Sequence, residues 1–350
     1  MVVHSLWFKR CGGSAKSKMS QRLPVLTIVV PCYNEAEVIP ETARRLSKLI
    51  DTLVLNRQVD PGSHICFVDD GSSDQSWAII RDLRLTSSLF SGLKLSRNRG
   101  HQTALLAGLM EATGDIVISL DADLQDDLGA IPKMIRAYVT GSDIIYGVRD
   151  CRLTDTVAKR ISAHAYYRLL RFLGVEIIFD HADFRLLSRR VVDSLRMYNE
   201  SNLFLRALIP QLGFRSQIVT YQRANRFAGE SKYSVASMCA LAWEGITSFS
   251  TRPLRIITAI GCAMSFFALA LTAWAVVAWL AFAATVPGWA STVIPIYLVC
   301  GVQMLSMGVI GEYIGKIYVE TKRRPRYHIE ENLTLTFPVS SKLIAISNTI

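Results

Sequence analysis

The sequence predicts an α/β domain with a mostly parallel sheet, followed by a pair of membrane-spanning helices. Between residues 24 and 149, short apolar runs alternate with stretches of helical periodicity, which is typical of parallel strands covered by helices on both faces. Two apolar stretches then follow at about 256–285 and 292–314, and crossing a bilayer takes about 20 such residues. The alternative is a buried helical hairpin in a soluble core, which the long uncharged first stretch disfavours.

The expected elements alternate regularly after a polar N-terminal extension, residues 1–20, which we expect to be disordered. Strands are expected at 25–30, 65–68, 93–95, 116–120 and 144–146, and helices at about 35–53, 75–85, 103–111 and 130–139. Ligands of parallel sheets bind beyond the carboxyl ends of the strands. The turns after these strands are therefore the places to search for a site.

The placement of Lys and Arg predicts the orientation of the spans. Arg252 and Arg255 precede the first span, a basic run from Lys316 to Arg326 follows the second, and residues 286–291 between them carry no charge. Basic residues mark cytoplasmic loops. We therefore expect a cytosolic α/β domain at 21–230, a juxtamembrane helix at 231–254, a transmembrane hairpin at 255–315 and a cytosolic tail at 316–350.

The formal net charge of +10 is better explained by membrane contact than by nucleic acid. Nucleic-acid binders concentrate basic residues in stripes with interleaved aromatics, whereas here they gather near the spans and along 149–171. Residues 154–173 and 233–249 read as amphipathic helices of the membrane interface, with packing on the sheet as the alternative for each. The seven cysteines form no CxxC pair and indicate neither a zinc site nor a disulfide framework.

An acidic turn directly after the strand at 116–120 is the strongest chemical signal. Asp121 and Asp123 lie two residues apart, so their carboxylates can converge on one hard cation, with Gln125 adding a neutral oxygen. Mg²⁺ or Mn²⁺ held there would neutralise a diphosphate leaving group. A solvated turn without a ligand is the alternative for this motif taken alone.

Three other polar turns share this position at strand ends. They are PCYNE at 31–35, VDDGSSD at 68–74 and NRGHQ at 98–102. Asp69 and Asp70 offer acceptors for a base or ribose, while Gly71 allows close approach of the backbone. Asp74 has a simpler role available as the cap of the following helix.

These motifs, in this order and spacing, resemble those of inverting family 2 glycosyltransferases with the GT-A fold. DFRLLSR, RFAGESKY and GEYIGKIY further along make the chain similar to polyprenyl-phosphate glycosyltransferases, which include dolichyl-phosphate mannose synthases and bactoprenol glucosyltransferases. The resemblance covers about residues 24–328. Arg99 departs from it, because many relatives carry an aromatic residue there.

The resemblance implies roles for individual residues. It assigns donor binding to Pro31, Tyr33, Glu35, Asp70, Asp121, Asp123, Gln125, Arg149 and Arg226. It assigns metal binding to Asp121, Asp123 and Gln125, and binding of the acceptor lipid phosphate to Lys159, Arg160, Ser162, Ser231 and Lys232. A solvated or lipid-facing charge pair is the alternative for Lys159 and Arg160.

The resemblance also implies the reaction: inverting transfer of a sugar from a nucleotide donor, with UDP-glucose the first candidate, onto undecaprenyl phosphate at a bacterial plasma membrane. Asp123 and Asp183 are the catalytic candidates, and a structural salt bridge with a neighbouring arginine is the alternative for Asp183. N-acetylhexosamine, mannose or aminoarabinose donors stay open. So do a processive polysaccharide synthase and a nucleotide-sugar-binding scaffold, although the chain has few spans and no QxxRW-type segment.

Small residues in the second span predict close helix packing. Gly301, Gly308, Gly311 and Gly315 recur along it. They would pack either against the first span or against another copy of the chain, and the resemblance implies a tetramer in the second case.

Overall fold

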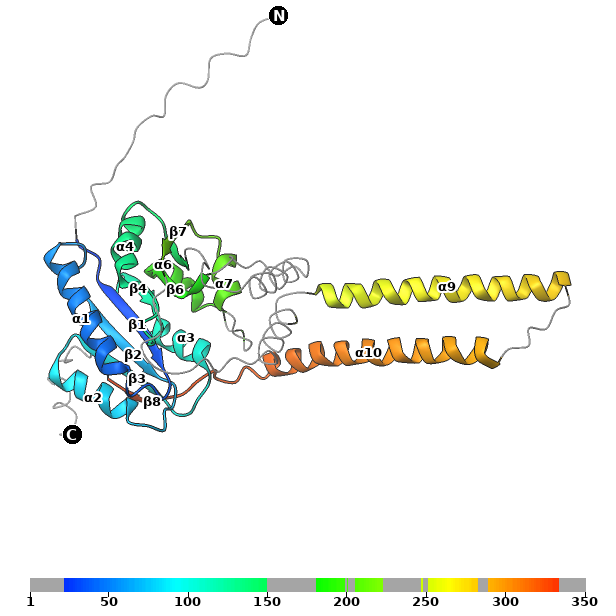
Figure 1. The fold of residues 1–350 in the computed structure, drawn as a ribbon, viewed down its shortest axis with the longest axis horizontal. Helices are drawn as coiled ribbons and strands as arrows, with labels where there is room; N and C mark the ends of the chain where they lie inside the picture. The colour runs from blue at the N-terminus through cyan, green and yellow to red at the C-terminus, as the bar shows by residue number, and fades with distance from the viewer. Residues whose placement is uncertain are drawn as a thin grey trace, which may run out of the picture.

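The computed structural model describes residues 22–149, 181–198, 200, 205–222, 247, 251–282 and 289–333, in which an eight-stranded sheet with helices on both faces is joined to two long helices (Figure 1). The first elements are β1 (Leu26–Cys32), α1 (Ile39–Leu55), β2 (His64–Asp69), α2 (Ser76–Thr86), β3 (Phe90–Leu95), α3 (His101–Glu111), β4 (Ile116–Ser119), the 3-10 helix η1 (Leu128–Ala130), α4 (Ile131–Val139) and β5 (Ile144–Arg149). Every element expected in this region is present, so the α/β prediction is confirmed.

The second half of the described chain contains elements that the sequence patterns did not reveal. They are β6 (His181–Ser188), α6 (Arg189–Leu195), α7 (Leu205–Gln211), β7 (Ser216–Tyr221) and β8 (Ile329–Asn332). The long helices α9 (Arg252–Phe282) and α10 (Trp289–Thr321) precede β8. Most residues of the two expected interface helices, and the extension at 1–20, lie outside the described residues.

The strand order is β7-β5-β6-β4-β1-β2-β3-β8. Strands β1 to β4 run parallel, so their carboxyl ends meet at one edge of the sheet. Strand β6 is antiparallel to β4 and pairs Arg185 with Ser119. Continuing that register by two residues brings Asp183 opposite Asp121, which places the start of β6 at the carboxyl edge of the parallel strands.

Two apolar layers enclose the sheet. Helices α1, α2 and α4 pack on one face, and α3, α6 and α7 pack on the other. Helix α3 approaches β1 and β2 closely, because a Cβ on Gly108 would lie only 2.3 Å from a Val29 methyl carbon. The turns that follow the strands therefore rest on a well-packed base.

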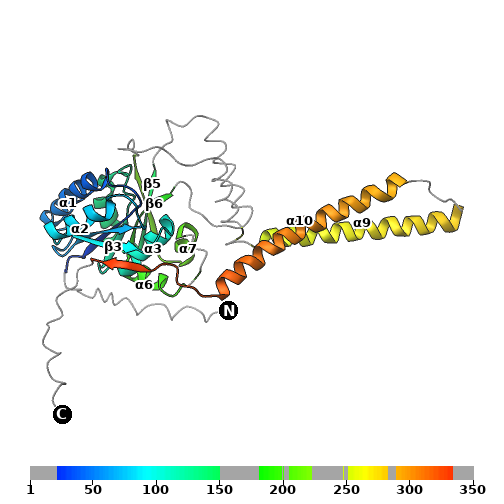
Figure 2. The same cartoon turned by 90° about the horizontal axis from the view of Figure 1, so that it is seen from below.

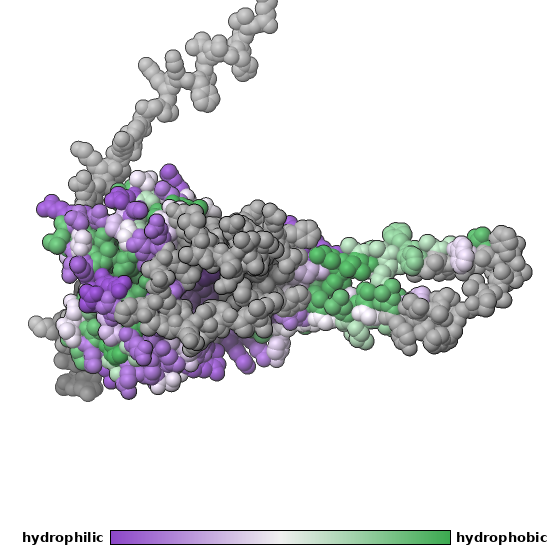
Figure 3. All heavy atoms as spheres, viewed as in Figure 1, coloured by the Kyte–Doolittle hydropathy of each residue, from purple (hydrophilic) through white to green (hydrophobic). Residues whose placement is uncertain are grey.

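Helices α9 and α10 lie side by side and project from the α/β domain (Figures 1 and 2). Apolar side chains gather along them, whereas hydrophilic ones dominate the domain (Figure 3). Among the described residues, one segment, Leu298–Thr321, is long and apolar enough to cross a membrane. Several side chains of α9 are outside the described set, so the pair of spans stays a prediction.

The glycines of α10 form no close contact with the described atoms of α9. No described atom lies within 4 Å of the position that a Cβ would take on Gly301, Gly308, Gly311 or Gly315. Packing of these glycines against the first span therefore finds no support in the described part of the chain.

The chain returns to the α/β domain after α10. Strand β8 pairs antiparallel with β3 and forms one edge of the sheet (Figure 2). Leu333 donates its backbone N–H to the Gly92 carbonyl at 2.7 Å, and Ser96 donates to the His328 carbonyl at 3.0 Å. A tail was expected from residue 316. In the structure, α10 continues to Thr321 and residues 329–332 form strand β8 of the sheet.

Candidate active site

The turns after β1 and β2 hold each other in place. Asn34 has a left-handed backbone (φ 53°), and its side-chain oxygen accepts the backbone N–H of Ser73 at 2.9 Å. Its own N–H donates to Ser72 Oγ at 2.9 Å. Pro31, Tyr33 and Glu35 come from the first of these turns, and Tyr33 is 43% exposed. An exposed aromatic beside fixed polar turns can stack on a planar ligand.

Asp70 fixes the turn that follows β3. Its carboxylate accepts the backbone N–H groups of Arg99 at 2.7 Å and Gly100 at 2.8 Å. Burial raises the pKa of Asp70, and the two backbone donors oppose that rise. Gly71 (φ 69°) is required here, because a Cβ would lie 2.6 Å from the Arg97 carbonyl carbon. Both carboxylate oxygens of Asp70 therefore serve the protein's own backbone.

One hydrogen bond from α1 and one within the turn hold the acidic turn after β4. Thr42 Oγ donates to the Ala122 carbonyl at 2.9 Å, and Gln125 N–H donates to Asp123 Oδ1 at 3.2 Å. Leu124 between them has a left-handed backbone (φ 57°), which is unfavourable for a residue with a Cβ. Burial raises the pKa of Asp121, and the nearby charges of Asp183 and Asp123 raise it further.

Asp183 at the start of β6 is the centre of the site's charge network. Its carboxylate accepts Gln102 Nε2 at 2.9 Å and Arg206 Nη2 at 3.0 Å, and it pairs with the fully buried Arg185. Burial disfavours its charged form, but Arg185, His101 and Arg206 outweigh burial and hold the pKa of Asp183 well below its usual range. The carboxylate is therefore ionised at neutral pH.

His101, the first residue of α3, bridges two carboxylates. Its Nε2 lies 3.4 Å from Asp121 Oδ1 and 3.4 Å from Asp183 Oδ2. Burial lowers the pKa of His101, yet the hydrogen bond to Asp183 and the charge of Asp121 raise it overall. Helix α3 thus joins the acidic turn to the Asp183 network.

The acidic turn fits a divalent cation that is also bound by substrate. Among the described residues, no group of three or more His, Cys, Asp or Glu side chains is placed to hold a metal by itself. Mg²⁺ and Mn²⁺ are commonly bound by one or two carboxylates together with substrate phosphates. The negative charges of Asp183 and Asp123 raise the pKa of Asp121, so a cation bound at this point would favour its charged form.

The predicted site residues divide into three groups. Pro31, Tyr33, Glu35, Asp70, Asp121, Asp123, Gln125 and Asp183 belong to turns or strand ends at the carboxyl edge of the sheet. Arg149 ends β5, and nothing further is described of its side chain. Lys159, Arg160, Ser162, Arg226, Ser231 and Lys232 lie outside the described residues. Their assigned roles stay predictions.

Three network residues were not singled out from the sequence. His101 and Gln102 stood in a polar turn without an assigned role, and Arg206 on α7 carried no motif signal. Arg206 contacts Asp183 although 23 residues separate the two. This contact depends on the tertiary fold: β6 pairs with β4, and Arg185 of β6 donates to the carbonyl of Leu205, the first residue of α7.

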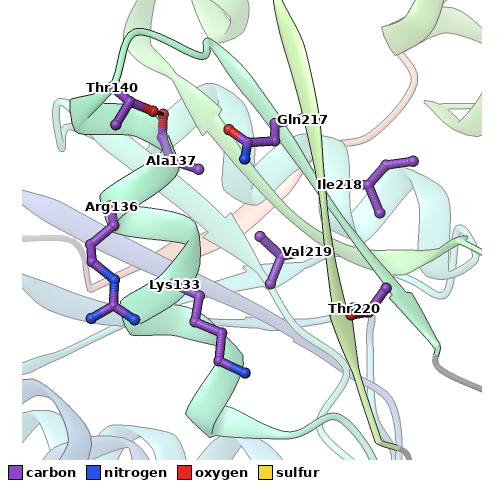
Figure 4. A pocket seen from close by; sticks show the side chains of 8 residues that line it. All are labelled: Lys133, Arg136, Ala137, Thr140, Gln217, Ile218, Val219 and Thr220. Atoms are coloured by element: carbon purple, nitrogen blue, oxygen red, sulfur yellow. Dashed lines mark hydrogen bonds between the residues drawn. The ribbon is translucent and has the colours of Figure 1, made fainter.

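A shallow hollow of about 390 Å³ lies away from these residues, between α4 and the edge strand β7 (Figure 4). Lys133 and Arg136 line it from α4, with Gln217 to Thr220 along the strand. It contains none of the predicted site residues and no cluster of reactive groups. The turns at the carboxyl edge are the better candidate for chemistry.

Known proteins resemble this chain along most of its length. A family model described as glycosyl transferase family 2 matches residues 27–196. The glycosyltransferase YkoT of Bacillus subtilis is 46% identical over 90% of this chain and 94% of its own length. The bactoprenol glucosyl transferase of Shigella phage SfX is 39% identical over 87% of this chain and 98% of its own.

The solved structures show more distant similarity. A mannosyltransferase from Pyrobaculum calidifontis, solved with GDP-Man and Mn²⁺, is 16% identical with a TM-score of 0.43, covering 84% of this chain and 88% of its own. The sequence relatives are far closer. On their identity and coverage, this chain belongs to glycosyltransferase family 2 and is a glycosyltransferase with the α/β sheet expected of the GT-A fold.

Proposed function

We propose that this glycosyltransferase transfers glucose from UDP-glucose to a polyprenyl phosphate, with inversion, at the cytoplasmic face of a membrane. One observation carries the proposal: the ionised Asp183 holds Arg206 and His101 beside the Asp121–Asp123 turn. A reaction between two phosphate-bearing substrates needs positive charge that is fixed in place and carboxylates that accept a cation. The names of the relatives, which include bactoprenol glucosyl transferases, support glucose as the sugar and a polyprenyl carrier as the acceptor.

The donor would bind across the turns after β1, β2 and β4. Tyr33 offers an exposed ring on which a nucleotide base can stack. Asp121 and Asp123, with Gln125, would hold a divalent cation on the donor diphosphate. When bound, the cation neutralises charge on the departing nucleoside diphosphate.

Asp183 acts in this proposal as an orienting group. Its pKa lies far below neutral and several donors occupy its oxygens, so it is a weak proton acceptor. The acceptor phosphate is already an anion and needs no base. Its oxygen attacks the anomeric carbon, the bond from that carbon to the nucleoside diphosphate breaks, and the configuration inverts. Arg206, with its side chain 40% exposed, is placed to orient a phosphate during this step.

The membrane part of the proposal places α9 and α10 as a transmembrane hairpin in a bacterial plasma membrane, with the catalytic domain in the cytosol. Large apolar side chains are exposed along both helices, among them Phe266, Trp274, Leu298 and Met304. Exposed apolar surface on this scale needs an apolar environment. Assembly into oligomers through α10 is part of the same proposal.

A donor screen in detergent tests the substrates. Purified protein would be incubated with undecaprenyl phosphate, Mg²⁺ or Mn²⁺, and labelled UDP-glucose, UDP-N-acetylhexosamine, GDP-mannose or UDP-aminoarabinose. We expect lipid-linked label with UDP-glucose above all others. Label transferred better from another donor would refute the choice of sugar, and no labelled lipid with any donor would refute the proposal as a whole.

A further inference from the structure

The acidic turn contains backbone strain that its own residues do not relieve. Leu124 is only 5% exposed and adopts a left-handed conformation between the two groups that hold the turn. Such a conformation costs roughly 1–2 kcal/mol for a residue with a Cβ. Thr42 fixes the first half of the turn through the Ala122 carbonyl. A second support is needed after Gln125.

Asp126 and Tyr221 provide that support from outside the turn. Tyr221 donates its hydroxyl hydrogen to Asp126 Oδ1, and both residues are nearly fully buried, at 3% and 4% exposure. A buried carboxylate is costly unless it is hydrogen-bonded, so this contact strongly favours one position of Asp126. The residue that follows Gln125 is thereby tied to the last residue of β7.

Tyr221 also contacts β6, the strand that carries Asp183. Its ring meets the Phe184 ring edge-on, with centroids 5.2 Å apart, and Phe184 lies between Asp183 and Arg185 in β6. In the sheet register Tyr221 is paired with Arg149, the last residue of β5. One side chain therefore spans the distance between the acidic turn and the strand that carries Asp183.

We propose that Tyr221 is a positioning residue: its hydroxyl holds Asp126 so that Asp121 and Asp123 are set for one divalent cation and the donor diphosphate. The inference rests on the proposed function for the identity of that ligand pair. Without the hydroxyl, the turn can relax at Leu124 and the two carboxylates no longer converge. Affinity for metal and donor is then reduced more than the rate of the bound complex.

The Tyr221→Phe variant tests this directly, because it removes the hydroxyl and keeps the ring against Phe184. Mn²⁺ binding would be measured in the presence of UDP, by electron paramagnetic resonance and by the shift of Tm with Mn²⁺ concentration. We expect the half-saturating Mn²⁺ concentration to rise about ten- to a hundredfold, the range that corresponds to one hydrogen bond to a charged group. At saturating metal, kcat should stay within about threefold of the unmodified protein.

Tyr138→Phe is the matched control, since Tyr138 is a partly buried phenol on α4 away from the turn. It should leave Mn²⁺ binding unchanged. Tyr221→Phe with unchanged Mn²⁺ affinity, or with a lower Tm and kcat at unchanged affinity, would overturn the inference. Failure of the unmodified protein to bind Mn²⁺ with UDP would also overturn it. Mn²⁺ binding without any sugar transfer would instead refute the proposed function alone.

Discussion

At the residue scale, Asp183 determines the arrangement of the site. It is 3% exposed at its side chain, and the guanidinium of Arg185 beside it is fully buried. A buried ion pair contributes little compared with an apolar pair, but removing one partner leaves the other charge uncompensated. The network is therefore sensitive to a change of a single atom at this position.

Asp183→Asn should lower the free energy of unfolding by about 3–5 kcal/mol, because Arg185 would remain buried without a counter-charge. Chemical denaturation in detergent measures this. Asp193→Asn is the matched control, since Asp193 is 54% exposed in its pair with Arg189 and such pairs contribute about 0–1 kcal/mol. A loss at Asp183 no larger than at Asp193 would contradict the assigned network.

The low pKa of Asp183 also predicts how the stability of the protein depends on pH. The folded pKa of Asp183 is lowered below the unfolded value of about 3.9, so its contribution to stability is fully present above that pH. It is lost as the pH falls through the folded pKa. The stability difference between the unmodified protein and Asp183→Asn should therefore shrink below about pH 4, as followed by denaturation at several pH values. A difference that grows with acid would contradict the ionised state.

At the element scale, the site consists of turns that strands and helices fix in unusual conformations. Asn34, Gly71, Gly100 and Leu124 all have positive φ. The two glycines differ in their surroundings, since a Cβ would clash at Gly71 but meet nothing within 4 Å at Gly100. A substitution at Gly100 therefore tests backbone strain alone, whereas a substitution at Gly71 adds a steric clash with neighbouring atoms.

Gly100→Ala should cost about 1–3 kcal/mol of stability, because its backbone (φ 88°, ψ 152°) lies in a region that almost only glycine adopts. Gly71→Ala should cost more and should also raise KM for the donor, because a Cβ there pushes against the Arg97–Asn98 backbone beside Asp70. Steady-state kinetics and thermal unfolding of both variants measure the two effects. Equal effects of the two substitutions would show that the close approach at Gly71 has no role.

The elements also differ in how well the sequence predicts them. Strands β1, β2, β4 and β5 were predictable because each contains an apolar run that a polar turn follows. Strand β3 was expected only at 93–95, because Ser91 and Gly92 interrupt its apolar pattern. Strand β6 was missed because Asp183 and Arg185 interrupt its apolar pattern, although both are buried. Strand β7 was missed because it is an edge strand with mostly exposed side chains. Periodicity reports burial of apolar side chains, so a strand with buried charges or one exposed face gives a weak signal.

The acidic turn shows the same limit for the site. Asp121 and Asp123 lie two residues apart in the sequence and were recognisable as a motif. The contacts of His101, Asp183 and Arg206 depend on the antiparallel pairing of β4 with β6, which joins segments about 65 residues apart in the register of the sheet. No local pattern encodes that pairing.

At the scale of the whole molecule, the chain after α10 binds back to the sheet that carries the site. Residues 322–328 link α10 to β8, and at about 3.5 Å per residue they reach at most about 28 Å. Two ion pairs join β8 to its neighbours. Lys94 of β3 pairs with Glu330 at 3.2 Å, and Arg81 of α2 pairs with Glu331 at 3.5 Å. Arg326 also donates to the Tyr198 carbonyl. The proposed membrane helix and the catalytic sheet are thus held close together.

A flexible Gly/Ser linker of about ten residues inserted after Lys322 would roughly double that reach. We expect it to lower transfer to polyprenyl phosphate in bilayers several-fold, with Tm nearly unchanged because β8 still pairs with β3. The same linker inserted after Leu333 is the control and should have no effect. Equal transfer rates for all three proteins in vesicles would show that the short connection does not position the domain.

The product itself tests the central claim, that the chain moves a sugar and not a sugar phosphate from a nucleotide donor to a lipid phosphate. Mass spectrometry of the lipid formed from undecaprenyl phosphate and UDP-glucose, with NMR of its anomeric centre, measures this. The account predicts one added hexose, a single phosphate, inverted configuration, and loss of product by at least about a hundredfold in Asp121→Asn and Asp123→Asn. A lipid carrying two phosphates, retained configuration, or full product formation by both variants would contradict it.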